Sequence, residues 1–278
     1  MSFKYYLYGT GLESKQEYQL TENILLRPVK MQSDIRWLEK NSNFFCYDFI
    51  VLYTLADQIS FELEINADTQ EKAITIAADE GRQLLNLLYL IKNSNITWQF
   101  MSCYSASSNL LDRFMVSAWN ISHAFAPAVL FWDNDIKTCV SLWPNFKKMM
   151  SNNAFNLACQ TAWTYLRCPG PHMRMAVIWS GIEALLWEFK QETTFQISLR
   201  AAKILGNDAL SRKKRVDDIK KLYTSRGNCV HGKYNQEKDL TLEKDITDSL
   251  LLLKELILFF TKRGSLMNKD EWLEFLCN

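Results

Sequence analysis

The spacing of apolar residues changes near the middle of this 278-residue chain. In the first half, short stretches rich in β-branched and aromatic residues alternate in places between apolar and polar positions, as half-buried strands do. This pattern predicts strands over residues 5–12, 22–29, 48–55, 59–66 and 96–105. Between residues 69 and 92 the apolar positions recur at steps of three and four, which predicts a helix with Asp68 as its N-cap. The segment that follows the last strand, up to about Val140, shows no clear period.

From about Pro144 onward the apolar spacing is helical. A first helix is expected over residues 153–167, where the sequence Cys-Pro-Gly-Pro at 168–171 ends it. Further helices are expected over residues 172–190, 195–205, 211–230 and 241–262. Gly232 suits the left-handed position that follows a helix end. Closely spaced helices with short connections predict an antiparallel bundle.

The expected fold class is therefore an α+β N-terminal domain followed by an all-α antiparallel helical bundle. We place the boundary between residues 1–143 and residues 144–278. The length agrees with two domains, since a typical domain has about 150 residues. Hydrophobic residues make up 48% of the chain and charged residues 23%, as in an ordinary globular protein.

Charge and cysteine content indicate which cellular compartment and which kinds of partner to expect. Lys and Arg number 32 against 31 Asp and Glu, so no global field draws the chain to nucleic acid, and RNA affinity has to come from a local patch. The seven cysteines are an odd number without framework spacing. The first sixteen residues turn polar before an apolar core of signal-peptide length forms, and no run of about 18 apolar residues occurs. We expect a cytoplasmic protein with free thiols and no membrane partner.

Arg226 occupies an unusual position on the predicted fourth helix of the bundle. An ideal α-helix advances about 100° per residue. On that helix, the residues within about 60° of Arg226 are apolar: Ile219, Leu222, Tyr223 and Val230. Glu183 is likewise surrounded by apolar residues on the second helix. A structural ion pair between the two and a role for Arg226 in substrate binding are compatible, because a carboxylate can orient a guanidinium whose other donors face a phosphate.

His231 follows Arg226 by five residues, which is about 140° around an undistorted helix. The two side chains diverge unless the last turn loosens or a second molecule completes the site. Gly227 and Gly232 make such loosening inexpensive. A lone histidine at a helix end can also be a capping or core residue.

The segment LYTSRGNCVHGK contains Arg226 and His231 as an Arg-x4-His motif. This motif resembles the signature of the HEPN superfamily, whose spacing is Arg-x4-6-His. The preceding segments AVIWSGIEALLWEF and ISLRAAKILG, with the basic helix before the motif, resemble the Apea-like branch of that superfamily. The resemblance spans roughly residues 153–260.

The resemblance implies a HEPN-like bundle that acts as a metal-independent endoribonuclease and a homodimer, with the two motifs meeting across the interface. Arg226 and His231 are then catalytic, and no cofactor is required. Attack of a ribose 2′-OH on its phosphate needs a base and an acid, which two histidines of a dimer supply. Paired arginines stabilise the charge that develops on the phosphoryl oxygens. The products are a 2′,3′-cyclic phosphate and a 5′-hydroxyl, and the substrates are single-stranded or tRNA-like RNA.

One position departs from the family pattern. HEPN ribonucleases commonly have a polar residue directly after the arginine, whereas this chain has Gly227 there and Asn228 one place later. Two alternatives therefore stay open: a non-catalytic RNA- or nucleotide-binding HEPN module, and a structural dimerisation or regulatory protein. The family's frequent biology implies a toxin or antiphage defence effector, whose N-terminal domain senses a trigger or inhibitor.

Basic residues gather around the motif and suggest a contact surface for RNA phosphates. They are Arg212, Lys213, Lys214, Arg215, Lys220, Lys221 and Lys233. A charge run of this kind can equally be a solvated helix face.

Two other kinds of site are disfavoured. The letters of residues 227–233 fit a phosphate-binding P-loop, but Tyr234 replaces the required Ser or Thr, and a helix rather than a strand precedes them. The three histidines and the cysteines show no paired metal-ligand spacing. We therefore expect neither a nucleotide-binding P-loop nor a metal.

Overall fold

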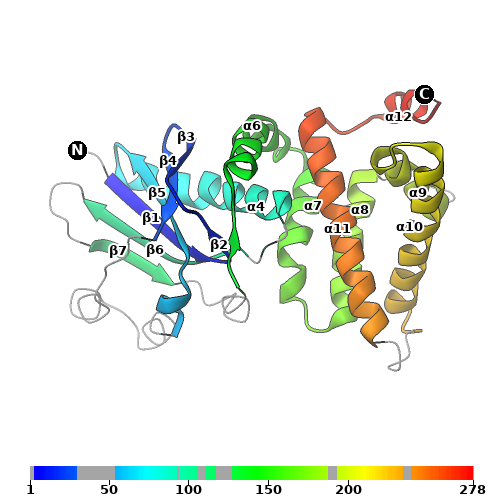
Figure 1. Ribbon diagram of the computed structural model, residues 1–278, viewed down its shortest axis with the longest axis horizontal. Helices are drawn as coiled ribbons and strands as arrows, with labels where there is room; N and C mark the ends of the chain where they lie inside the picture. Colours follow the sequence, from blue (N-terminus) through cyan, green and yellow to red (C-terminus); the bar gives the residue numbers. More distant parts are fainter. Residues whose placement is uncertain are drawn as a thin grey trace. The chain divides into compact units, whose positions relative to one another are not determined.

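Two units make up the chain in the computed structural model, Met1–Trp143 and Pro144–Asn278 (Figure 1). The structure describes residues 3–29, 54–92, 94, 96–105, 111–116, 127–186, 193–233 and 239–277. Within these ranges the first unit contains an antiparallel sheet with helices, and the second is mostly helical. The predicted order, an α+β part followed by a helical part, is confirmed.

A six-stranded sheet with the order β3-β4-β5-β1-β6-β7 is the centre of the described part of the first unit. Its strands are β1 (Phe3–Thr10), β3 (Tyr18–Thr21), β4 (Ile24–Pro28), β5 (Phe61–Ala67), β6 (Thr97–Ser105) and β7 (Leu111–Val116). All the pairings in this sheet are antiparallel. A short parallel pair joins β2 (Leu12–Glu13) to β8 (Val129–Leu130). The first strand of the chain is therefore central, between two strands from much later in the sequence.

Most of the predicted strands are present with shifted ends. The strands expected over 5–12, 22–29, 59–66 and 96–105 correspond to β1, β4, β5 and β6. The strand expected over 48–55 is wrong at its end, because Thr54 and Leu55 are helical and a 3₁₀ turn, Ala56–Gln58, follows them. Residues 48–53 lie outside the described ranges. The sequence pattern does not predict β3 or β7.

A helical layer packs on one face of the sheet. Helix α3 (Gln70–Ile76) and the π-helical turn after it, Ala77–Gly81, contact β1 and β5, and α4 (Arg82–Ile91) continues from that turn. A Cβ added at Gly81 would lie 2.8 Å from Leu7 Cδ1, so glycine permits this close approach. The predicted N-cap is wrong by one residue. Thr69, not Asp68, has the extended backbone of a cap, and its hydroxyl accepts the Lys72 N–H.

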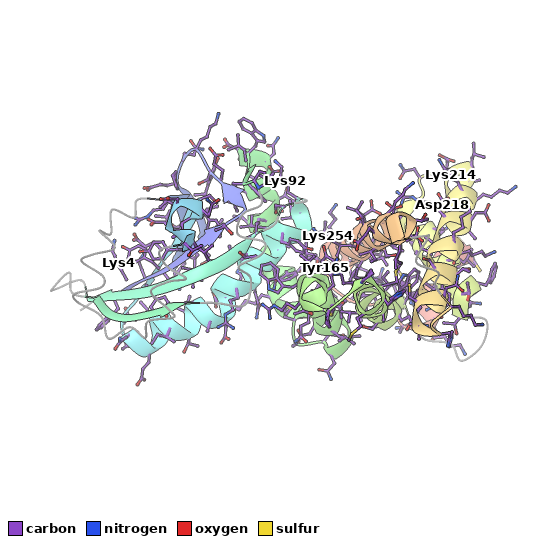
Figure 2. The ribbon with its side chains drawn as sticks, turned by 90° about the horizontal axis from the view of Figure 1, so that it is seen from below. Lys4, Lys92, Tyr165, Lys214, Asp218 and Lys254 are labelled. Atoms are coloured by element: carbon purple, nitrogen blue, oxygen red, sulfur yellow. The ribbon has the colours of Figure 1, made fainter. Side chains whose placement is uncertain are left out.

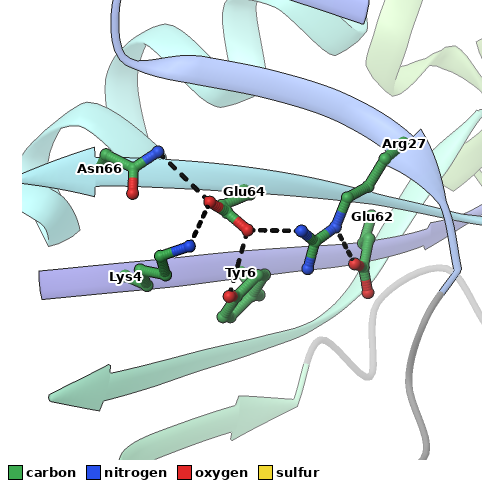
Figure 3. Close-up of polar contacts among 6 residues, drawn as sticks. All are labelled: Lys4, Tyr6, Arg27, Glu62, Glu64 and Asn66. Carbon is green, nitrogen blue, oxygen red and sulfur yellow. Dashed lines mark hydrogen bonds and ion pairs between the residues drawn. The ribbon is translucent and has the colours of Figure 1, made fainter. Parts of the chain in front are cut away.

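Charged residues cluster on the opposite face of the sheet, because alternate residues of a strand point to opposite sides (Figure 3). Arg27 on β4 contacts two buried carboxylates of β5, Glu62 and Glu64. Lys4 on β1 donates to Glu64 at 2.8 Å and Tyr6 donates to it at 3.2 Å. Burial would raise the pKa of Glu64, but Lys4 and Arg27 more than offset it and hold that pKa below its usual value. Burial and then the Glu64 charge raise the pKa of Tyr6 to about 12.

The second unit is a helical bundle. Its helices are α7 (Asn153–Thr164), α8 (Pro171–Leu186), α9 (Thr193–Leu205), α10 (Ala209–Val230), α11 (Asp239–Arg263) and α12 (Lys269–Cys277). A 3₁₀ turn, Tyr165–Arg167, completes the first predicted helix, and residues 187–190 of the second lie outside the described ranges. The pattern predicts neither α12 nor α6 (Asp133–Met149), which extends across the boundary between the units and contains Pro144.

Helices α7, α8 and α11 pack against one another, and α10 lies against α8 and α9. A Cβ added at Gly181 on α8 would lie 2.1 Å from Thr161 Oγ1 on α7, so the two helices approach as closely as glycine allows. Trp179 is fully buried and donates through Nε1 to Ser249 Oγ of α11 at 3.1 Å. This packing fixes α8 as the support against which the motif-bearing helix α10 lies.

Candidate functional site

Both ends of α10 are defined by sequence-specific contacts. At the start, Asp208 and Ser211 form a capping box, in which each side chain accepts the other residue's backbone N–H. At the end, the Lys233 N–H donates to the Asn228 carbonyl at 2.8 Å, while the Gly232 N–H donates to the Cys229 carbonyl at 3.3 Å. These bonds form a Schellman motif, which needs the positive φ of 63° found at Gly232. The predicted helix end at Gly232 is confirmed.

Arg226 forms an ion pair with Glu183, which is one of the two interpretations that the sequence leaves open. Its Nη2 atom lies 3.1 Å from Oε1 and 3.3 Å from Oε2 of that carboxylate. The guanidinium also lies over the ring of Tyr223, 5.6 Å from its centroid, and that ring meets Trp179 edge to face at 5.1 Å. The Arg226 and Glu183 side chains are 24% and 13% exposed, so water only partly screens the pair.

The ion pair leaves part of the guanidinium unused. Arg226 Nε is buried and has no hydrogen-bond partner among the described residues. A buried donor without an acceptor costs about 1–3 kcal/mol, so an acceptor that reaches Nε would be favoured. Phosphate oxygens are well matched to such a donor, because a guanidinium can present two N–H groups in parallel. Arg226 is thus held in place by Glu183, and its Nε has no acceptor among the described residues.

Tyr223 adds a third member to this cluster. Burial is the largest cause of its raised pKa, followed by the charge of Glu183 and by a hydrogen bond to that carboxylate. The phenol therefore remains protonated at neutral pH. Glu183 thus lies beside both Arg226 and Tyr223.

His231 lies at the C-cap of α10 with its side chain exposed. The last turn does not loosen, because the His231 N–H still donates to the Gly227 carbonyl at 3.0 Å, four residues back. The angular separation of about 140° from Arg226 therefore persists. Within one chain the guanidinium faces α8, and the imidazole points to a different side of α10.

Gly227, directly after the arginine, is not required by packing. No described atom lies within 4 Å of the position that a Cβ would occupy there. Its backbone is helical, so a side chain at this position meets neither strain nor a neighbour. An alanine at this position would therefore be accommodated.

The basic residues of α10 have several different surroundings. Arg212 donates from Nε to the Gly206 carbonyl at 3.1 Å, and Arg215 lies 3.7 Å from Glu255 of α11. Lys213, Lys214 and Lys233 are exposed, and Figure 2 marks Lys214 on α10. Consecutive residues of a helix are about 100° apart, so residues 212–215 point in four directions. The two arginines have structural contacts, which leaves the lysines as the more available cations.

Lys220 and Lys221 are brought together with Asn228 along a groove between α10 and α11. The same groove is lined by Thr224, Ser225, Thr241 and Asp245. The sequence pattern does not single out these four residues. These residues come together only because α10 packs beside α11. The spacing of residues along one helix does not reveal that packing.

Three further properties concern only the described residues. The cysteines Cys139, Cys159, Cys168, Cys229 and Cys277 are free thiols. Within these ranges, no three side chains of His, Cys, Asp or Glu are placed to bind one metal ion together. Of the helices described, none has the length and apolar character needed to span a membrane.

The chain matches no family model, no curated protein and no solved structure. The HEPN resemblance therefore rests on the Arg226 to His231 motif and the sequence around it. The structural surroundings of Arg226 and His231 are the basis for a functional hypothesis.

Proposed function

We propose that the helical unit is a HEPN-type endoribonuclease, independent of metal, that acts as a homodimer with Arg226 and His231 of each copy as catalytic residues. The observation that carries this proposal is how the Arg226 guanidinium is held and which of its donors has no partner. Glu183 holds its Nη2, its Nε is buried without a described acceptor, and the exposed His231 ends the same helix. A positioned cation and an accessible imidazole are groups that phosphodiester chemistry uses, once a second copy of the chain brings them together.

The divergence of the two side chains within one chain supports the proposal of a dimer. One chain supplies a single imidazole, whereas the reaction needs both a base and an acid. In the proposed site, one His231 removes the proton of the ribose 2′-OH as the 2′-oxygen bonds to phosphorus. The bond from phosphorus to the 5′-oxygen then breaks, and the second copy's His231 protonates that leaving oxygen. Arg226 stabilises the negative charge on the non-bridging oxygens.

The wider biology in this proposal comes from the resemblance. HEPN ribonucleases frequently act as toxins or antiphage effectors, and we infer that this chain is a cytoplasmic effector of that kind acting on single-stranded or tRNA-like RNA. The N-terminal sheet unit is then the part that senses a trigger or restrains the nuclease. The exposed lysines of α10 would contact phosphates beyond the cleaved one.

A structural role is the competing candidate, and the ion pair itself favours it. Glu183 and Arg226 form an ion pair beside the Tyr223 ring, of the kind that fixes how two helices pack. In a purely structural protein, losing Glu183 would loosen the bundle and His231 would have no effect on RNA. The catalytic proposal instead requires Arg226→Ala and His231→Ala to fold and to lose activity.

Cleavage assays distinguish these candidates. Purified full-length protein and its His231→Ala variant are incubated with single-stranded RNA, transfer RNA and single-stranded DNA, each with and without EDTA. The proposal predicts that the wild type cuts RNA but not DNA, that EDTA has no effect, and that the variant is inactive. Cleavage that persists in the variant, or that EDTA abolishes in the wild type, rejects it.

A further inference from the structure

A groove of about 480 Å³ lies in the first unit, between the first two turns of α6 and the chain that leads into β3. We call it the α6 groove. Gln16 and Tyr18 line one side of it. The α6 residues on the other side recur at steps of three and four, so they form one face of that helix. The volume is within the range for small-molecule sites, about 300–1,000 Å³.

The carboxylate of Asp133, in the first turn of α6, is held through one of its two oxygens. The Tyr18 hydroxyl donates to Oδ1 at 2.6 Å, and Gln16 Nε2 donates to the same oxygen at 3.1 Å. The hydrogen bond to Asp133 is the largest cause of the raised pKa of Tyr18, so the phenol keeps its proton at neutral pH. Among the described residues none donates to Oδ2. The carboxylate is therefore oriented and keeps one oxygen for a ligand.

Lys137 lies one helical turn after Asp133, at a spacing where opposite charges often pair. Asp68 and Lys72 have the same spacing and do pair, at 3.0 Å. Asp133 and Lys137 form no ion pair with each other or with any other residue in the described ranges. Both are exposed, so a solute reaches them. The α6 groove thus presents an acceptor oxygen and an ammonium about one turn apart.

The same face of α6 has an apolar part. Ile136 and Val140 line the groove beside the two charged residues. Ile136 is 3% exposed, whereas Val140 is 39% exposed. Covering the Val140 side chain with an aliphatic group removes apolar surface from water, which favours binding. A ligand that uses the whole face therefore has a cation, an anion and a short aliphatic chain.

We propose that the α6 groove binds a free α-amino acid with an aliphatic side chain. The ammonium of the ligand would donate to Asp133 Oδ2, its carboxylate would accept from Lys137, and its side chain would cover Val140. An amine without a carboxylate leaves Lys137 unpaired, and an acid without an ammonium leaves Asp133 unpaired. This binding is separate from the proposed RNA cleavage, because Arg226 and His231 take no part in it.

Isothermal titration calorimetry on the full-length protein tests the groove with L-valine, L-leucine and L-isoleucine. At least one of them should bind with a Kd of about 0.1–1 mM, because exposed charges are partly screened by water. Three analogues test each contact: the amide of the best ligand lacks the carboxylate, its deaminated acid lacks the ammonium, and glycine lacks the side chain. Each analogue should bind at least about threefold more weakly.

Variants locate the binding on α6. Lys137→Gln should weaken binding of the best ligand about threefold to tenfold without changing Tm, because its ammonium has no described partner to lose. Asp133→Asn should weaken binding to a similar extent, since its remaining oxygen still accepts from Tyr18 and Gln16 but the negative charge is gone. Lys148→Gln is a matched control, because Lys148 is exposed on α6 but outside the groove, and binding should not change.

Three results overturn the proposal. One is that none of the three amino acids binds at concentrations up to about 10 mM, ten times the weakest expected Kd. Another is that the amide binds as tightly as the free amino acid, which would assign the groove to the N-terminal residue of a peptide. The third is that Lys137→Gln and Asp133→Asn bind as the wild type does. All three concern binding alone and are independent of whether His231 is needed for RNA cleavage.

Discussion

Glu183 of α8 and Arg226 of α10 bring their charged groups to 3.1 Å and join the two helices through a half-buried ion pair. The pair orients the guanidinium, and it leaves Nε without a described acceptor. The same contact therefore supports the bundle and fixes the position of the arginine that we propose binds phosphate. Variants at both residues separate these two contributions.

Glu183→Gln should lower the free energy of unfolding by about 1–3 kcal/mol, because it leaves the Arg226 charge half-buried and uncompensated. Urea denaturation of the purified variant measures this loss. Arg174 and Glu243 form a matched control between α8 and α11, at 3.5 Å and more exposed. Glu243→Gln should cost less than about 0.5 kcal/mol. Equal losses in the two variants would contradict the special position of Glu183.

The two glycines of the motif should respond to alanine with opposite signs. Gly227 is helical and has free space around it, so Gly227→Ala should stabilise the protein by about 0.5–1 kcal/mol. Gly232 has a φ of 63°, so Gly232→Ala should destabilise it by about 1 kcal/mol. Thermal unfolding of both variants provides the test. A stabilising Gly232→Ala would show that the Schellman ending is not formed.

Lys254 should make stability depend on alkaline pH. This residue lies on α11 and is 4% exposed, and burial lowers its pKa from 10.5 to about 7 (Figure 2). Between these pH values the unfolded chain holds a proton that the folded chain has released, so stability rises with pH. The gain should be on the order of 2 kcal/mol between about pH 7 and pH 9. Denaturant titrations at both pH values should show a smaller rise in Lys254→Met, and an equal rise would contradict the assignment.

Glu64 should make the sheet unit sensitive to acid. Lys4 and Arg27 hold its folded-state pKa below the ordinary value of 4.5, so its contribution to stability is present above pH 4.5 and is lost as pH falls through the lowered value. Glu64→Gln should cost about 2–4 kcal/mol at neutral pH, because Arg27 keeps only Glu62. The difference in unfolding free energy between wild type and variant should shrink towards about pH 3. A constant difference across this range would exclude the ionic contribution.

Features carried by local sequence could be predicted. Gly232 ends α10, and the Cys-Pro-Gly-Pro segment separates the first two helices of the bundle, because such residues impose backbone conformation directly. The pairing of Glu183 with Arg226 could also be inferred, since each charged residue interrupts an apolar stripe. Helix α6 could not be predicted, because Pro144 lies inside it and proline ordinarily breaks a helix.

Features that depend on packing could not be predicted. The position of β1 between β5 and β6 joins strands far apart in the sequence, and the contact of Arg27 with Glu62 depends on the register of β4 against β5. The unsatisfied hydroxyl of Ser225 becomes visible only once α11 is placed beside α10. Periodicity gives the faces of single elements, whereas a site between elements needs their arrangement.

His231→Ala should leave the fold intact, because the imidazole is exposed and only its backbone N–H takes part in the helix end. The variant should have the same Tm as the wild type within about 1 °C, as expected for an exposed position without such contacts. Circular dichroism melting checks this. A large loss of stability would mean that the imidazole has a structural role, and any loss of RNA cleavage could then not be assigned to chemistry.

The ends of the RNA fragments test the central proposal most directly. RNA is incubated with the wild-type protein in EDTA, and the ends of any fragments are identified by mass spectrometry beside those from a His231→Ala reaction. Attack by the 2′-OH predicts 2′,3′-cyclic phosphates and 5′-hydroxyls from the wild type, and intact RNA from the variant. Fragments with 3′-hydroxyl and 5′-phosphate ends, or no fragments from the wild type, would contradict the proposed role of Arg226 and His231.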